Sequence, residues 1–201
     1  MEKSDSNKVI RMAREQGILK ASDLGAHGIN RKILTRLVGK GRLERVGRGL
    51  YRIAGAEYET PYHQYAEVQR RFPKSVICLI SALSFHEITT QIPYELWLAI
   101  GKKARRPKLE HMTIRIVRFA DQALEEGVKE YAIEGVPVKI TNPARTVADC
   151  FKYRNKIGLD VALEALKEGL KERRFTMDEL WRYTKLCRVS NVIRPYIESV
   201  V

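Results

Sequence analysis

The stretch NRKILTRLVGKGRLERVGRGLYRI, residues 30–53, decides the fold of the amino-terminal part of this chain. In its first half, apolar residues recur at the spacing of one helical face, which predicts a helix capped by Asn30 and ended by Gly39 and Gly41. These apolar residues are Ile33, Leu34, Leu37 and Val38. In its second half, two β-prone runs, 43–46 and 50–53, flank Gly47-Arg48-Gly49. Glycine accepts the backbone angles of a tight turn, so this half is predicted to form a β-hairpin.

Positive charge is concentrated on the same stretch. The 201 residues carry 37 Lys and Arg against 24 Asp and Glu, a net charge of +13. Residues 1–55 hold 13 of these cations and 5 of the acids, and between Arg31 and Arg52 eight cations face one acid, Glu44. Such a balance indicates an anionic partner, and nucleic acid is the first candidate.

Two further helices are predicted ahead of this stretch. An apolar stripe around Val9–Ala13 ends at Gly17, and Ser22 caps a short second helix that closes near Gly28. Helix, short helix, basic helix and basic hairpin is the order of a winged helix-turn-helix, whose third helix enters the major groove of DNA. We therefore expect residues 1–55 to be a DNA-binding domain of this kind.

The DNA-contacting residues are predicted in two groups. One group lies on the exposed face of the third helix and is expected to reach base edges and nearby phosphates: Arg31, Lys32, Thr35 and Arg36. The other is expected to contact the sugar-phosphate backbone: Lys40, Arg42, Arg45, Arg48 and Arg52. Arg48 sits at the hairpin tip, where arginine suits the negative potential of a minor groove.

Residues 56–201 are predicted to form a larger, mixed α+β domain that ends in helices. Helix 61–71, with Thr60 as N-cap, is followed by a helix capped by Ser81, strands at 96–100 and 113–118, and a hairpin turning at 134–135. Asn142 and Pro143 predict the start of the next helix, in which Arg145 and Asp149 are spaced to pair. Three helices follow. The first, from Leu159, is strongly amphipathic, the second has Thr176 and Glu179 as a capping box, and the third begins near Ser190 with Pro195 as a candidate kink.

A second basic block lies between the two predicted strands, in what reads as a hairpin loop. Its five cations are Lys102, Lys103, Arg105, Arg106 and Lys108. The block is either a second nucleic-acid or partner surface or an ordinary solvated loop, and the sequence leaves both open.

No enzymatic, metal or cofactor site is predicted. Asp121, Glu134 and Lys139 are the nearest approach to a metal-dependent nuclease set, but such a site needs acidic oxygens converging on one cation. The four histidines are scattered, and the three cysteines are too few and too far apart for a disulfide framework or a zinc site. They are expected to be reduced thiols in a cytoplasmic protein, since the chain shows neither a signal peptide nor a membrane span.

Several motifs, in this order, resemble the AbiEi family of antitoxins from bacterial abortive-infection, type IV toxin–antitoxin systems. They are ASDLGAHGINRKILTRLVGKGRLERVGRGLYRI, SALSFHEI, YELWLAIGKKARRP and VKITNPARTVADCFKY, which together span most of residues 18–155. The resemblance implies a repressor that binds inverted repeats in its own operon and counteracts a nucleotidyltransferase-like toxin, with or without a stable complex. It places DNA contacts at Arg31, Lys32, Thr35, Arg36 and Arg48.

Two other functions remain open from the sequence. One is a winged-helix transcriptional regulator whose carboxy-terminal domain senses a ligand or a protein. The other, less favoured, is a metal-dependent nuclease targeted by the basic domain. Neither the operator sequence nor the oligomeric state is readable from the residues.

Overall fold

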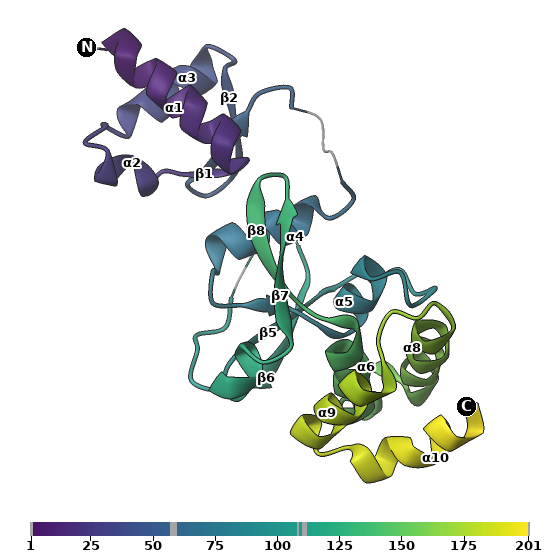
Figure 1. The fold of residues 1–201 in the computed structure, drawn as a ribbon. Helices are drawn as coiled ribbons and strands as arrows, with labels where there is room; N and C mark the ends of the chain where they lie inside the picture. The colour runs from purple at the N-terminus through teal and green to yellow at the C-terminus, as the bar shows by residue number, and fades with distance from the viewer. Residues whose placement is uncertain (1, 57–59, 108, 110–111, 201) are drawn as a thin grey trace. The chain divides into compact units, whose positions relative to one another are not determined.

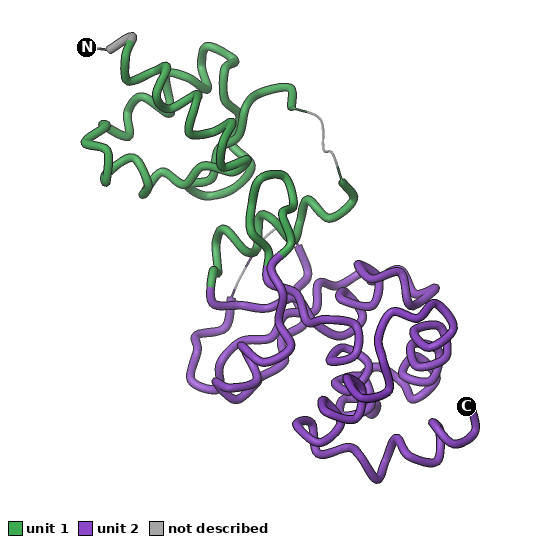
Figure 2. Tube along the Cα trace, in the orientation of Figure 1, with its two compact units in different colours: residues 1–73, 131–138 green, residues 74–130, 139–201 purple. Residues whose placement is uncertain are grey.

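The computed structural model of the chain describes residues 2–56, 60–107, 109 and 112–200. It has the predicted mixed α+β composition and ends in helices (Figure 1). The chain forms two compact units (Figure 2). The first unit holds residues 1–73 and 131–138, and the second holds residues 74–130 and 139–201. A division into domains 1–55 and 56–201 stays a prediction, because compactness does not show which segment folds alone.

The first unit begins with three helices and a small antiparallel sheet. In chain order these are α1 (Glu2–Gln16), β1 (Leu19–Lys20), α2 (Asp23–Ala26), α3 (Lys32–Gly39), β2 (Leu43–Gly47) and β3 (Leu50–Ile53). The strand order is β1-β3-β2, so the predicted hairpin gains a third strand that the sequence did not reveal. The helices and the hairpin share one apolar core: Val9, Ile10, Met12, Ala13, Leu19, Leu24, Ile29, Ile33, Leu34, Leu37 and Leu43.

The first unit also contains α4 (His63–Arg71) and the tip of a later hairpin. The Nη2 atom of Arg70 donates hydrogen bonds to Gln16 Oε1 at 2.7 Å and to Asp23 Oδ2 at 2.6 Å. His63 Nδ1 lies 2.7 Å from Glu134 Oε2. The predicted start of α4 was two residues early: Thr60 accepts a hydrogen bond from the Tyr62 backbone, but Tyr62 is the N-cap.

The second unit is built on a five-stranded sheet, although residues 131–138, at the tip of its last hairpin, are assigned to the first unit. Its strands are β4 (Val76–Ile77), β5 (Leu96–Gly101), β6 (Ile114–Phe119), β7 (Val128–Ile133) and β8 (Val136–Thr141), in the order β6-β5-β4-β8-β7. The β7–β8 hairpin turns at Glu134-Gly135 as predicted, and both residues have positive φ angles, 49° and 74°. The expectation of a hairpin between β5 and β6 is wrong, because these strands are parallel, with Leu98 opposite Ile116. The dozen residues between them, 102–113, are long enough for the crossover that parallel neighbours require.

Helices complete the second unit. They are α5 (Leu79–Phe85), the 3₁₀ turn η1 (Asp121–Leu124), α6 (Pro143–Lys152), α7 (Arg154–Ile157), α8 (Leu159–Lys171), α9 (Met177–Cys187) and α10 (Ser190–Val200). The Thr176–Glu179 capping box is present, and α10 continues through Pro195. The Ser81 prediction is wrong, because Cys78 is the N-cap of α5 and the Ser81 hydroxyl accepts the backbone N–H of Trp97 at 2.9 Å.

Helix α6 starts as its sequence predicts. It packs against α5, α8 and α9 in the apolar core of the second unit. The Asn142 side chain accepts the Arg145 backbone N–H, and Pro143 follows at the first helical position. The predicted Arg145–Asp149 pair is confirmed, with Nε to Oδ2 at 2.9 Å and the two side chains 1% and 0% exposed. The guanidinium also donates to the carbonyl of Glu126 at 2.7 Å. A pair this deeply buried is held by hydrogen bonds as well as by charge.

Buried His86 makes the stability of the second unit depend on pH. Its Nε2 lies 2.7 Å from the Thr141 carbonyl oxygen, and burial lowers the pKa of His86 below its ordinary value. Below about pH 6.5 the unfolded chain therefore binds a proton that the folded chain does not. The free energy of unfolding should fall by up to about 1.4 kcal/mol per pH unit in that range. In urea denaturation between pH 7.5 and 5.5, His86→Gln should lose less stability than the wild type; an equal loss would contradict this account.

Candidate nucleic-acid interface

The helix predicted to read DNA is α3, and its start is fixed by local hydrogen bonds. Asn30 Oδ1 accepts the backbone N–H of Lys32 at 3.0 Å, while Arg31 occupies the N-cap position. The helix thus begins one residue later than predicted, although the Asn30 side chain still satisfies one of its free N–H groups. Ile33, Leu34 and Leu37 are buried, and this fixes which face of α3 remains in solvent.

The solvent-facing side of α3 carries the predicted residues. Arg31, Lys32 and Thr35 are exposed, and Arg36 is half-buried. Arg36 Nη2 donates to the hydroxyl of Ser6 on α1 at 3.1 Å, which orients this guanidinium. Because residues three and four apart are neighbours on a helix, the four side chains share one surface. Beside them lies a shallow hollow of about 280 Å³, to which Asp5 contributes the one carboxylate among its lining residues.

The hairpin presents a second set of cations. Its two strands shift register between Arg45 and Gly47, and Gly49 has a φ of +72°, a conformation that favours glycine at the turn. Arg48 is exposed at this turn, and Arg45 is exposed with its Nε bonded to the Gly47 carbonyl at 3.1 Å. Lys40 and Arg42, in the connection from α3 to β2, are exposed as well.

Arg52 differs from the other predicted contacts. Its Nε is paired with Glu44 on the neighbouring strand, and the Arg52 side chain is only 12% exposed. Its charge is therefore partly neutralised within the sheet, and a phosphate contact by Arg52 stays a prediction.

The second basic block is exposed where it is described. Lys102, Lys103, Arg105 and Arg106 all lie in solvent, whereas Lys108 is outside the described residues. Arg118 organises the start of this loop, because its Nη1 donates to the carbonyls of Gly101, Lys102 and Ala104 at 2.9, 2.6 and 3.0 Å. Of the four described cations of the block, Arg106 lines a pocket with residues of β6, an arrangement that the charge pattern alone did not reveal.

Two of the acidic residues considered for a nuclease site have structural roles. Glu134 is bonded to His63, and Asp121 opens the η1 turn. Within the described ranges, no group of three or more His, Cys, Asp or Glu side chains could hold a metal ion. The cysteines, 78, 150 and 187, are free and buried, and burial raises the pKa of each thiol. A raised pKa keeps each thiol protonated, and the thiolate is the reactive form. We therefore assign these buried cysteines a packing role.

Comparison with known proteins finds a family match in the first unit. Residues 7–54 match the family described as "Transcriptional regulator, AbiEi antitoxin", which confirms the predicted resemblance for the first of the four motifs; the other three lie outside the match. No protein of curated function matches the chain. The fold is similar to the crystal structure of the RV2827C protein from Mycobacterium tuberculosis, with a TM-score of 0.60 and 12% identity over 90% of this chain and 71% of that one. None of the described helices is both long and apolar enough to cross a membrane.

Proposed function

Because residues 7–54 match the AbiEi family of transcriptional regulators, we propose that this protein is a DNA-binding antitoxin that represses its own operon. The observation that carries the proposal is the exposed cationic side of α3, next in sequence to an arginine-rich hairpin within the matched segment. In this reading the first unit contains a winged helix-turn-helix in which β2 and β3 form the wing.

The chemistry of contact follows from the exposed groups. A major groove admits an α-helix, and Arg or Lys forms paired hydrogen bonds with guanine O6 and N7. Arg31, Lys32, Thr35 and Arg36 would read base edges and adjacent phosphates, while Lys40, Arg42 and Arg45 would bind the backbone. Arg48 at the hairpin turn would reach the sugar-phosphate backbone or the adjacent minor groove. A C2-related pair of such domains, or two cooperating monomers, would fill an inverted repeat.

The two cations at the start of α3 destabilise the free helix, which indicates that they are present to bind an anion. A helix N-terminus carries partial positive charge, so Arg31 and Lys32 there cost about 0.3–1 kcal/mol each. No acidic residue stands in the first turn to offset them. An anion bound at this end would reverse the sign, because free backbone N–H groups and cations would both attract it.

The second part of the proposed function is antitoxin activity against a nucleotidyltransferase-like toxin. It rests on two observations. The matched family is described as an antitoxin, and the three motifs within residues 81–153 resemble that family in type and order. The test first looks for a nucleotidyltransferase-like gene beside this one, and then expresses the full chain, wild type or Arg31→Ala/Lys32→Ala, from an independent promoter together with that gene. Both proteins should rescue growth, while only the wild type should repress a reporter driven by the operon's own upstream region. Absence of rescue by the wild type would refute the antitoxin part.

Salt dependence tests the contribution of the hairpin. Each phosphate that a protein neutralises contributes about −0.9 to the slope of log K against log salt concentration. Arg48→Ala should therefore reduce the steepness of this slope by about one, measured by fluorescence anisotropy with the upstream DNA. Lys185→Ala, which removes an exposed cation from α9, is the matched control and should leave the slope unchanged. An unchanged slope for Arg48→Ala would show that the hairpin does not contact phosphate.

A further inference from the structure

Strand β6 (Ile114–Phe119) is the edge of the five-stranded sheet, with β5 as its neighbour. The Leu96 N–H donates to the Thr113 carbonyl at 2.9 Å, and this bond sets the phase of the parallel ladder. Residues 113, 115, 117 and 119 therefore bond to β5, while the backbone groups of 114, 116 and 118 point away from the sheet. An edge of this kind is a template for pairing with another extended chain.

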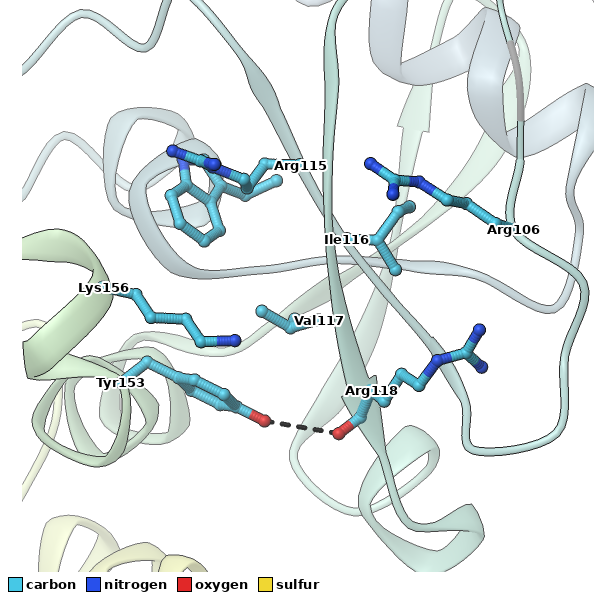
Figure 3. A pocket seen from close by; sticks show the side chains of 8 residues that line it. Arg106, Arg115, Ile116, Val117, Arg118, Tyr153 and Lys156 are labelled. Atoms are coloured by element: carbon cyan, nitrogen blue, oxygen red, sulfur yellow. Dashed lines mark hydrogen bonds between the residues drawn. The ribbon is translucent and has the colours of Figure 1, made fainter.

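One described side chain already uses the outer edge. The Tyr153 hydroxyl donates to the carbonyl oxygen of Arg118 at 3.3 Å (Figure 3). Burial raises the pKa of Tyr153 to about 12, so the hydroxyl keeps the proton that it donates. No other strand of the described residues covers β6 on this side.

The edge opens onto a pocket of about 750 Å³ whose charged lining residues are all basic. They are Arg106, Arg115, Arg118 and Lys156, together with apolar groups of Trp97, Ile116, Val117 and Tyr153. Figure 3 shows Arg115 and Lys156 on one side of the strand and Arg106 and Arg118 on the other. Cations thus flank both faces of the edge instead of converging on one point.

The contacts of these cations decide how much positive charge each one presents to a ligand. Arg115 lies over the Trp97 ring, 5.5 Å from its centroid, and its Nε is 3.0 Å from Glu95 Oε2. Arg118 is held by three backbone carbonyls, which fix the guanidinium without neutralising its charge. Lys156 lies 5.6 Å from the centroid of the Tyr153 ring. The charge of Arg115 is thus partly neutralised by Glu95, while Arg106, Arg118 and Lys156 give the pocket lining a positive potential along an unpaired strand.

We propose that the β6 edge docks an extended acidic peptide segment of a protein partner, which adds a strand beside β6. Backbone groups of Ile116 and Arg118 would pair with the incoming strand, and its side chains would alternate between the two cationic faces. Lys and Arg on an edge repel a basic strand and discourage pairing in general, whereas an acidic strand is attracted by the same charges. This surface lies in the second unit and goes beyond the proposed DNA binding, so either can fail without the other.

Single-stranded nucleic acid is the other polyanion that a basic groove attracts, and it is distinguished by the backbone. A phosphodiester chain can pair with the cations, but it has no backbone N–H groups with which to continue a β-ladder. A peptide binds in the proposed way only if its own N–H groups bond to the β6 edge. Proline lacks that N–H, so an acidic peptide with proline at the pairing positions keeps its charge and loses the ladder.

The test uses the full chain and a fluorescent six-residue peptide, Glu-Glu-Val-Val-Glu-Glu, whose carboxylates lie on both faces of an extended strand. Three comparison probes are the Lys–Val analogue, the Glu peptide with both valines replaced by proline, and a short oligothymidine. We expect the Glu–Val peptide to bind, to slow amide hydrogen exchange in residues 114–118, and to lose about tenfold or more in affinity on proline replacement. Tenfold weaker binding is also expected for Arg106→Glu/Lys156→Glu but not for the control pair Lys167→Glu/Lys185→Glu, exposed on α8 and α9.

Three results would overturn the proposal. The first is the absence of peptide binding or of protection at residues 114–118. The second is equal binding by the proline peptide, which would make the interaction one of charge alone. The third is binding by oligothymidine that protects the same residues while the peptide does not, which would make the edge a nucleic-acid surface. Circular dichroism of the charge-reversal pair shows that any loss of binding is not a loss of folding.

Discussion

Replacing Arg145 by methionine is expected to lower the free energy of unfolding by about 3–5 kcal/mol, the cost of leaving a buried charge without its partner. The Asp149 carboxylate is fully buried and would retain one hydrogen bond, from Cys187 Sγ to Oδ1 at 3.1 Å. The carbonyls of Glu126 and Ala123 would also lose the guanidinium N–H donors. Methionine fills similar space beside Phe119, so lost packing contributes less to the destabilisation than the buried Asp149 carboxylate left without its cation.

The pH dependence separates this mechanism from simple loss of packing. Burial already raises the pKa of Asp149, and the neighbouring guanidinium opposes that rise. Without Arg145 the folded-state pKa should rise further above the unfolded value of about 3.9, so the folded state holds a proton that the unfolded state releases. The variant should therefore lose stability as pH increases through this range, and its deficit should be smaller at pH 5 than at pH 8.

Urea denaturation measures both effects, and both tryptophans, Trp97 and Trp181, report from the second unit. Lys171→Met is the matched control, because it breaks the surface pair with Glu168, at 3.2 Å, and should cost about 1 kcal/mol or less. A deficit for Arg145→Met that is equally small, or that does not change with pH, would contradict the role assigned to the buried pair.

The double substitution Arg31→Ala/Lys32→Ala should weaken DNA binding and stabilise the free protein. Each contact to a base or phosphate contributes about 1–3 kcal/mol, so affinity for the upstream DNA should fall on the order of 100-fold or more. Removing two cations from the start of α3 should at the same time raise the free energy of unfolding by roughly 0.3–1 kcal/mol each. Opposite signs for the two measurements distinguish a binding residue from one that maintains the fold.

Anisotropy titrations and thermal unfolding, both at a fixed salt concentration, measure this pair of effects. Lys167→Ala/Lys185→Ala changes the net charge equally in the second unit and should leave both measurements nearly unchanged. If that control weakened DNA binding as much, affinity would reflect total charge and the assignment of α3 would be wrong. If Arg31→Ala/Lys32→Ala destabilised the free protein, the two residues would have a structural role.

Elements governed by local chemistry were the ones that the sequence predicted well. The caps at Asn142 and Thr176 bond to backbone only three residues away, and the 134–135 turn needs two adjacent positive φ angles. Strand β1 was missed because two residues carry no periodicity, and it exists only by pairing with β3. The parallel pairing of β5 and β6 was missed for the same reason, since pairing direction is set by distant contacts.

The exposure of most candidate DNA-binding residues was predictable, because they lie on one helical face and in one turn. Their exposure follows directly from the burial of Ile33, Leu34 and Leu37 on the opposite side. The partnership of Arg52 with Glu44 was not predicted, because it depends on the strand register that places the two side by side. The β6 edge was also missed: its cations come from the loop, the strand and α7, and only the fold brings them together.

The first unit is discontinuous in sequence, and this limits how the protein can be recombined. Gly17, with a φ of +63°, lies so close to the Glu134 carbonyl that an added Cβ would be 1.6 Å from the oxygen. The surroundings of Gly17 and His63 thus come from two separate segments of the chain, residues 1–73 and 131–138. A chimera that joins residues 1–73 to another protein must therefore carry residues 131–138 as well, or it will expose His63 and the bend at Gly17 to water.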